Sequence, residues 1–307
     1  MANATQAPLV ICVGHASLDQ IYRVGMLPDR EGKYRAIEHI EAGGGMAANA
    51  AAAISKAGGR SELWSRIGDD DAGVKIRRWL EVDKVDIRHV QRISDARSST
   101  SAIIVDSGGD RMIIGARDIS MPSDTTALPI ERIKEAAVVL ADLRWMEAVR
   151  AVFSRAGELG IPRVLDADLG GREALPELLA LTDYAIFSEA ALADFLPDLD
   201  TQARLDRVML HGPKHAGVTC GVRGYVWRDT FGGGSVPAFK VGVVDTTGAG
   251  DAFHGGFSLA VAERRSVVDC ARFAAAVAAM KCTRLGARAG LPDRASVEAF
   301  LANAETL

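Results

Sequence analysis

The sequence is poor in several features that would place it in a specialised class of protein. Only four of its 307 residues are cysteine, ten are proline and 6% are aromatic. The cysteines lie far apart, with no Cys-x-x-Cys pair and no histidine at metal-binding spacing, which favours reduced thiols in a core over disulfides or a zinc site. A chain of this length buries enough apolar surface to fold without such crosslinks.

Long apolar runs and an excess of positive charge are also missing. No apolar stretch approaches the ~18 residues that a membrane helix needs, and the N-terminus lacks the pattern of a secretory signal. Thirty-six Lys and Arg against forty Asp and Glu give a net charge of −4, which disfavours nucleic acid as a partner. We therefore expect a cytoplasmic protein that binds neither membranes nor nucleic acid.

Alternating strand and helix patterns fill most of the chain. Short apolar, β-branched runs such as Leu9–Gly14 are typical of buried strands, and beyond about residue 130 they alternate with helical segments. This alternation predicts an α/β fold with a parallel sheet covered by helices on both faces. Residues 19–41 and 98–117 instead show half-exposed alternation, so we expect them to form a small β-sheet lid. A late β-ribbon is expected at 224–228 and 238–241.

The segment Val243–Phe257 carries the strongest chemical signal. A strand runs into Thr-Thr-Gly-Ala-Gly, and a helix is predicted to begin at Asp251. The backbone N–H groups of Gly248, Ala249 and Gly250 can converge at the start of that helix, where they and the helix dipole would stabilise phosphate charge. Asp251, beside this anion hole, could accept a proton from an attacking hydroxyl, the alternative being a plain N-cap.

Two segments together resemble the signatures of one family. Asp245–Asp251 (DTTGAGD), followed by an aromatic residue and a glycine-rich helix, is similar to the C-terminal signature of PfkB carbohydrate kinases, which have the ribokinase-like fold. Glu41–Ala51 (EAGGGMAANAA) resembles their N-terminal signature. The resemblance covers nearly the whole chain. It implies a single kinase domain over residues 1–307, an α/β/α sandwich with a lid, that transfers the γ-phosphoryl of ATP to a sugar hydroxyl with Mg²⁺.

The resemblance also implies roles for individual residues. It makes Asp251 the general base and the 248–251 amides the anion hole. On the sugar side it implies Asp19, Gly44, Gly45 and Asn49. On the nucleotide side it implies Ser188, Thr219, Gly221, Gly224 and Gly250. In the family, carbonyl groups near this loop often hold a monovalent cation such as K⁺, here near Asp245 and Thr247.

One departure from the family pattern affects the expected metal shell. Where the family commonly has Asn-x-x-Glu after the middle strand, this chain has Ser188-Glu189-Ala190-Ala191. Either Glu189 or a water network would then take over the role of the missing groups near Mg²⁺ and phosphate.

Four local stretches resemble bacterial 6-deoxy-6-sulfofructose kinases: Gly32-Lys33-Tyr34, Ser98–Ile103, Ala141–Trp145 and Lys281–Pro292. This resemblance implies that Lys33 on the lid and Arg144 at a strand end hold an anionic group on the sugar. The alternatives are a solvated lid residue and a surface ion-pair partner. Gly115 stands where a polar residue would be expected for a sulfonate, although Arg117 could compensate. A neutral ketohexose or another acidic sugar therefore stays open.

Several other functions are compatible with parts of the sequence. Ribokinase-, fructokinase- or nucleoside-kinase-like activity and a non-catalytic binding protein remain as alternatives. A dinucleotide-dependent oxidoreductase is disfavoured because Val13–Asp19 lacks the G-x-G-x-x-G turn, and a Walker kinase because G-x-x-x-x-G-K-[ST] is missing. Exposed lid strands often pair with a second subunit in the family, so the resemblance also implies a homodimer.

Overall fold

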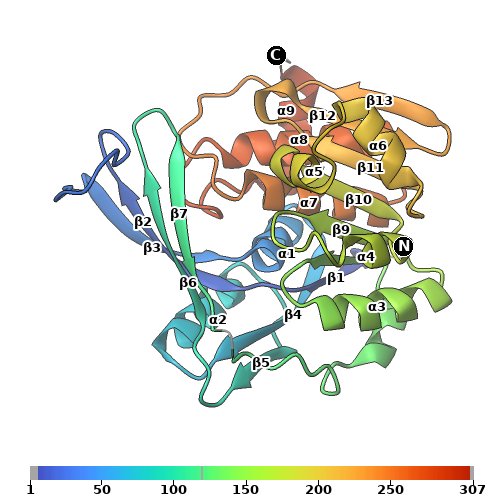
Figure 1. The fold of residues 1–307 in the computed structure, drawn as a ribbon, viewed down its shortest axis with the longest axis horizontal. Coiled ribbons are helices and arrows are strands. Elements are labelled where there is room, and N and C mark those ends of the chain that lie inside the picture. The colour runs from blue at the N-terminus through green and yellow to red at the C-terminus, as the bar shows by residue number, and fades with distance from the viewer. Residues whose placement is uncertain (1–5, 119, 305–307) are drawn as a thin grey trace, which may run out of the picture.

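A mostly parallel sheet forms the centre of the larger part of the molecule (Figure 1). The computed structural model describes residues 6–118 and 120–304, and nine strands of this described chain form one sheet in the order β13-β12-β11-β10-β9-β8-β1-β4-β5. Neighbouring strands from β5 to β11 are parallel, whereas β12 and β13 join as antiparallel strands. The bounds are β1 Leu9–Val13, β4 Arg60–Gly68, β5 Val90–Ile93, β8 Val138–Asp142, β9 Arg163–Ala167, β10 Tyr184–Ser188, β11 His215–Thr219, β12 Tyr225–Asp229 and β13 Gly232–Val236.

Helices cover both faces of this sheet because its strands are apolar on both sides. Val10 and Cys12 of β1 belong to the apolar core on one face, and Ile11 and Val13 to the core on the other. The first core is covered by α1 Met46–Lys56, α2 Asp71–Val82, α7 Ala249–Ala262, α8 Val267–Lys281 and α9 Arg294–Asn303. The second is covered by α3 Met146–Glu158, α4 Leu175–Ala180, α5 Glu189–Phe195, α6 Thr201–Met209 and the short 3-10 helix η1 Ile130–Glu135.

Helix α1 brings a polar side chain into an otherwise apolar interior. Its buried positions are alanines apart from Ile54 and Asn49. Alanine favours helix and leaves little side chain between α1 and its neighbours, so α1 packs directly against α7 and β1. Asn49 is thereby held close to the start of α7.

A separate four-stranded sheet forms the lid, seen at the left of Figure 1. Its order is β3-β2-β6-β7, with β2 parallel to β6 and the two outer pairs antiparallel. The strands are β2 Ser17–Arg23, β3 Glu38–Gly44, β6 Ser99–Val105 and β7 Arg111–Ala116. Ile21, Ile103 and Val105 form its small apolar core. The predicted fold class, a parallel α/β sandwich with a β lid, is confirmed.

The late β-ribbon differs from the prediction. Strand β12 pairs with Gly232–Val236, not with 238–241. Glycines carry no strand signal in a sequence, yet one of them here lies against an aromatic ring, since a Cβ on Gly234 would lie 2.5 Å from the Trp227 side chain. Ala238 and Lys240 instead line a cavity. Within residues 6–118 and 120–304, no helix combines the length and apolar character needed to cross a membrane.

Candidate active site

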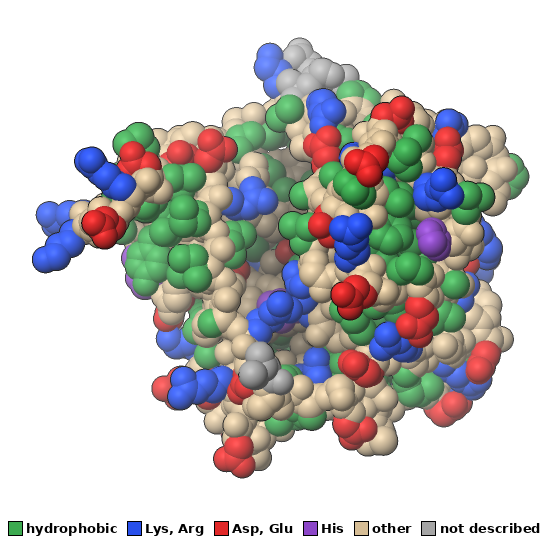
Figure 2. Space-filling model, in the orientation of Figure 1, with side chains coloured by type: hydrophobic (Ala, Val, Ile, Leu, Met, Phe, Trp, Pro, Cys, Tyr) green, Lys and Arg blue, Asp and Glu red, His purple; other side chains and the backbone are tan. Residues whose placement is uncertain are grey.

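A cavity of about 1010 Å³ lies between the lid and the carboxyl ends of the parallel strands. Open α/β sheets bind their ligands at this edge. Figure 2 shows the hollow between the lid and the rest of the molecule, with Lys and Arg side chains along it. The predicted site residues that line it are Asp19, Gly45, Asn49, Arg144, Ser188, Thr219, Gly221, Gly224, Thr247, Gly248, Ala249, Gly250 and Asp251.

Three predicted site residues do not line the cavity. Gly44 and Asp245 each adjoin a residue that lines the cavity without lining it themselves, and Asp245 is fully buried. Lys33 lies in the exposed arm that joins β2 to β3, beyond the last strand pair at Arg23 and Glu38. The arm therefore carries Lys33 away from the cavity, a consequence of the hairpin length that no local pattern reveals.

The phosphate-binding loop, residues 245–250, ends at the first turn of α7. Gly248 is the N-cap of this helix and has a left-handed backbone with φ 74°, which a residue with a side chain would adopt only under strain. The Ala249 amide donates to the Thr246 carbonyl over 3.2 Å, whereas the Gly250 and Asp251 amides begin the helix without a carbonyl of a preceding turn. Their position on the cavity makes the end of the loop suitable for an anion.

Asp251 lies on the first turn of α7 and is hydrogen-bonded to α1. The Asn49 Nδ2 group donates to Asp251 Oδ2 over 2.7 Å. Removal from water raises the pKa of Asp251 to about 7, and repulsion from the Asp166 carboxylate adds to the rise. A carboxylate with a pKa near the working pH is well suited to accept a proton.

Arg288 fixes the orientation of Asn49, and the sequence analysis missed it. Its Nε donates to Asn49 Oδ1 over 2.8 Å, so the amide must turn its NH₂ group toward Asp251. Its Nη2 donates to the Gly44 carbonyl over 3.0 Å, and Nη1 lies 3.5 Å from Asp83 Oδ2. The signal available in the sequence was the place of this arginine between Gly286 and Gly290, within residues 282–292, which form the closing loop after α8.

The sugar side of the cavity is shaped by the contact between β2 and β3. Asp19 is buried and accepts a hydrogen bond from Ser17 Oγ over 3.0 Å. A Cβ on Gly44 would lie 2.1 Å from Asp19 Oδ2, so only glycine fits there. Burial raises the pKa of Asp19, and the Arg288 charge partly opposes that rise.

Three further aspartates stand at the carboxyl ends of β8 and β9. Asp142 is buried and accepts hydrogen bonds from the amides of His15, Ala47 and Arg144 over 2.8–3.0 Å, which ties the start of α1 to the sheet. Burial, followed by repulsion from Asp168 and Asp142, raises the pKa of Asp166 well above its usual range. Acidic residues directly after buried parallel strands were the signal that sequence reasoning passed over.

His254 connects these carboxylates to α7. Its Nδ1 donates to the Gly250 carbonyl over 2.7 Å, and its Nε2 lies 3.5 Å from Asp166 Oδ1. Its Nε2 also lies 3.2 Å from the Ile186 carbonyl. Burial lowers the pKa of His254, although the contacts with the Ile186 and Gly250 carbonyls and the nearby carboxylates oppose the change. The ring thus spans the space between the first turn of α7 and the end of β9.

The predicted nucleotide side begins at the end of β10. Ser188 caps α5 by accepting from the Ala191 amide, and its Oγ donates to Asp168 Oδ1 over 2.7 Å. Glu189 forms an ion pair with Arg223 and is not among the residues that line the cavity. The acidic group on this side of the cavity is therefore Asp168, which directly follows β9, and not Glu189.

Two arginines face the cavity from opposite walls. Arg144 follows β8 in the main sheet and Arg117 follows β7 in the lid. Removal from water lowers the pKa of half-buried His15 to about 3, and the charges of Arg144 and Arg117 add to the effect. Within the described chain, neither guanidinium forms an ion pair with an acidic side chain. This part of the cavity can therefore receive an anion.

Comparisons with known proteins agree with this geometry. Residues 7–294 match the pfkB family carbohydrate kinase. The chain is 31% identical over 300 residues to an ATP-dependent ribose-1-phosphate kinase of Halopiger xanaduensis, covering 95% of this chain and 97% of that one. An Agrobacterium tumefaciens structure, provisionally described as a ribokinase, matches with a TM-score of 0.92 and 34% identity over 96% and 98% of the two chains. Arabidopsis thaliana ribokinase complexed with ribose and ATP matches with a TM-score of 0.84 and 26% identity over 97% and 99%. The chain belongs to the pfkB family of carbohydrate kinases.

Proposed function

We propose that this protein is an ATP-dependent kinase that phosphorylates a hydroxyl group of a small sugar bearing an anionic substituent. The observation that carries the kinase chemistry is the place of Asp251, at the start of α7 and on the same cavity as the sugar-side and nucleotide-side residues. ATP as the donor is supported by the ribose-1-phosphate kinase relative and by the ribokinase solved with ATP.

Asp251 would act as the general base. The sugar hydroxyl oxygen attacks the γ-phosphorus, the bond between that phosphorus and the bridging oxygen of ADP breaks, and the hydroxyl proton passes to the Asp251 carboxylate. The hydrogen bond from Asn49 holds this carboxylate in place, and Arg288 holds Asn49. Most of the remaining barrier is lowered by positioning and charge stabilisation, as is usual in phosphoryl transfer.

The amides of residues 248–251 would stabilise the negative charge of the transferred group. The positive end of the α7 dipole adds to their effect. On the lid side, Arg111 donates to Thr246 Oγ1 and so joins β7 to the phosphate-binding loop. A lid held in this way excludes water, which would suppress hydrolysis of ATP.

Mg²⁺ would accompany the nucleotide, and Asp166 and Asp168 are the residues suited to hold it. Magnesium is usually bound through one or two carboxylates together with substrate phosphates. The crowding that raises the pKa of Asp166 would be relieved by a cation beside it. When bound, the ion would neutralise phosphate charge.

The anionic substituent of the sugar would lie between Arg144 and Arg117. Two unpaired guanidinium groups on facing walls provide planar, bidentate donors for a phosphate or sulfonate. A phosphorylated sugar agrees with the ribose-1-phosphate kinase relative, and 6-deoxy-6-sulfofructose is the sulfonated candidate. Lys33 does not line the cavity, and position 115, which does, is a glycine without a polar side chain.

A substrate screen tests this assignment. Ribose, fructose, a nucleoside, ribose-1-phosphate and 6-deoxy-6-sulfofructose would each be offered with ATP and Mg²⁺, and ADP release would be followed. We expect the highest kcat/KM with one of the two anionic sugars. Arg144→Gln should lower that kcat/KM by roughly 10- to 150-fold, from loss of about 1.5–3 kcal/mol of charged hydrogen bonding. Lys33→Gln, the matched control outside the cavity, should change it little. Preference for ribose, fructose or the nucleoside would refute the anionic substrate.

A homodimer formed by the lids is the proposed assembly. The outer face of the lid sheet exposes Tyr22, Met112 and Ile114, whereas its inner face lines the cavity. Exposed apolar patches of this kind mark interaction surfaces. A second copy, offering the same face, would cover it.

A further inference from the structure

A fully buried lysine supports the phosphate-binding loop. Lys281 is the last residue of α8 and its side chain is 0% exposed. Its Nζ donates to the Asp245 carbonyl over 2.8 Å and lies 4.0 Å from Asp245 Oδ2. Burying an ammonium group costs several kcal/mol unless nearby oxygens compensate it, so this contact requires an explanation.

Asp245 connects the ammonium group to the anion hole. One oxygen of its carboxylate, Oδ1, accepts from the Thr247 amide over 2.8 Å, and Oδ2 accepts from the Gly286 amide over 2.7 Å. The carboxylate therefore bridges the phosphate-binding loop and the closing loop. Gly248, at the start of the anion hole, is three residues further along. A displacement of Asp245 would be passed directly to the amides that face the cavity.

The surroundings of Lys281 place one carboxylate near its ammonium group and leave little free space. Burial lowers the pKa of Lys281, but the Asp245 carboxylate opposes that change most strongly. The Cys282 carbonyl accepts from the amides of Val244 and Asp245, and a Cβ on Gly290 would lie 2.3 Å from the Lys281 carbonyl. The Lys281 ammonium group is thus enclosed beside the loop as a positive charge that belongs to the chain itself.

We infer that the Lys281 ammonium group is a built-in cation that positions the phosphate-binding loop, so that turnover needs no added monovalent cation. A monovalent metal ion near Asp245 and Thr247, which the family resemblance implied, would require the same carbonyl and carboxylate oxygens and would be repelled by the ammonium group. Lys281 is thus a positioning residue, acting through Asp245. The inference rests on the proposed kinase function for its link to turnover.

The first test compares monovalent cations with the unaltered enzyme. Replacing NaCl by KCl at constant ionic strength, with Mg²⁺ and ATP saturating, should change kcat less than about twofold, because the charge is already present. A strict requirement for K⁺ would overturn the inference. This test does not depend on whether any variant folds.

The second test separates the charge of Lys281 from its bulk. Lys281→Met keeps the apolar stem and removes the charge, and should lower kcat by about tenfold or more even where Tm is close to that of the unaltered enzyme. Lys281→Ala leaves room for a small cation, so NH₄⁺ should raise both its kcat and its Tm more than Na⁺ does. Lys134→Ala, on exposed η1, is the control and should respond to neither ion.

The outcomes distinguish this inference from the proposed function. The inference is overturned if Lys281→Met keeps its full kcat, or if Lys281→Ala has the same Tm in NH₄⁺ and in Na⁺. Either result would show that Lys281 only fills space in the interior. If the unaltered enzyme phosphorylates no sugar, the proposed function fails, but the Tm response of Lys281→Ala still decides whether a cation belongs beside Asp245.

Discussion

At the scale of single residues, two hydrogen bonds link Arg288 to Asn49 and Asn49 to Asp251, and so fix the position of the proposed base. Each of these residues is held by a hydrogen bond of 2.7 or 2.8 Å, and the residues come from three separate segments of the chain. Asn49 and Asp251 could be predicted because they lie in two motifs with a strong local pattern. Arg288 could not, because only the folded chain brings the closing loop against α1.

The raised pKa of Asp251 predicts a pH-dependent activity. A base must be deprotonated to accept a proton, and burial raises the pKa of this carboxyl to about 7. Below that value the proportion of active enzyme falls about tenfold per pH unit, so kcat/KM should rise with pH and level off above about 7. The measurement is a kcat/KM profile between pH 5 and pH 9, the limits being about two units on either side of the inflection.

Replacing the base should remove both the activity and the inflection. Asp251→Asn is expected to lower kcat by about 10²–10⁴-fold, the usual contribution of a general base. The matched control is Asp269→Asn, because Asp269 occupies the same first-turn position in α8 and is exposed. A profile that kept its inflection in Asp251→Asn would assign the pH dependence to another group.

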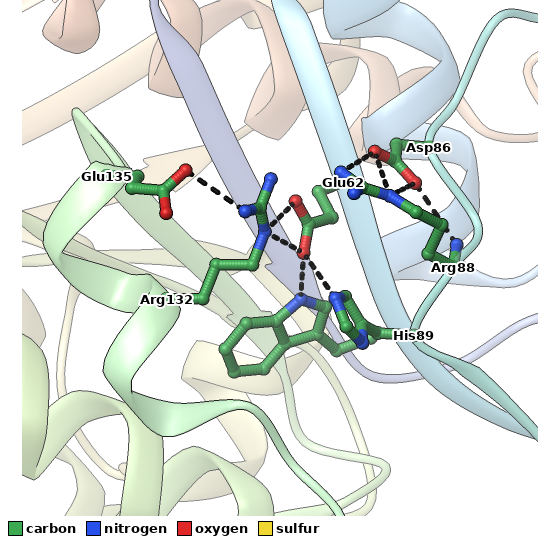
Figure 3. Close-up of polar contacts among 7 residues, drawn as sticks. Glu62, Asp86, Arg88, His89, Arg132 and Glu135 are labelled. Atoms are coloured by element: carbon green, nitrogen blue, oxygen red, sulfur yellow. Dashed lines mark hydrogen bonds and ion pairs between the residues drawn. The ribbon is translucent and has the colours of Figure 1, made fainter.

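At the scale of elements, the sheet contains a buried carboxylate far from the proposed chemistry. Glu62 of β4 is 1% exposed and accepts from Trp64 Nε1 over 2.8 Å and from Arg132 Nε over 2.9 and 2.7 Å (Figure 3). His89 Nε2 lies 3.4 Å away on the other side. These contacts join β4 to η1 and to the segment before β5.

Removing the arginine of this cluster should destabilise the fold. Arg132→Ala leaves a buried carboxylate without its cation, which typically costs about 3–5 kcal/mol. The control is Arg150→Ala, which breaks an exposed pair with Glu177 and should cost about 0–1 kcal/mol. The free energy of unfolding would be measured by urea denaturation at neutral pH. A loss for Arg132→Ala no larger than that of the control would show that water replaces the arginine.

The elements themselves were largely predictable where the local signal was strong. Short apolar runs are present in β1, β9 and β10, and the consecutive alanines of α1 favour a helix. The glycine strand β13 was missed because its pairing depends on Trp227, a partner in another strand. In the same way, whether Lys33 or Arg117 faces the cavity is decided by how far each lid strand extends, which is a tertiary property.

At the scale of the whole molecule, the lid sheet presents different chemistry on its two faces. Along β7, Arg111, Ile113 and Gly115 line the cavity, so the alternate residues Met112 and Ile114 lie on the outer face. Their cross-strand neighbours extend this face across β6 and β2 through Ile104, Ala102 and Tyr22. Gln20, His39 and Glu41 make the β2–β3 end of the outer face polar. Antiparallel strands normally turn polar side chains to water, so the apolar part formed by β7 and β6 indicates a covered surface.

A twofold dimer would cover this face with its own copy, as most homo-oligomers do. Light scattering after size exclusion should then give about twice the 32.5 kDa of one chain.

Ile114→Glu places a charge in the middle of the outer face and should shift the protein to monomer, because an unpaired charge in an apolar interface is costly. Leu210→Glu, at an exposed apolar position after α6, is the control and should leave the mass unchanged. Because Ile113 and Arg111 on the same strand line the cavity, the monomer should also show a higher KM for the sugar. A single-chain mass for the unaltered protein at micromolar concentration would leave the lid face uncovered and contradict the dimer.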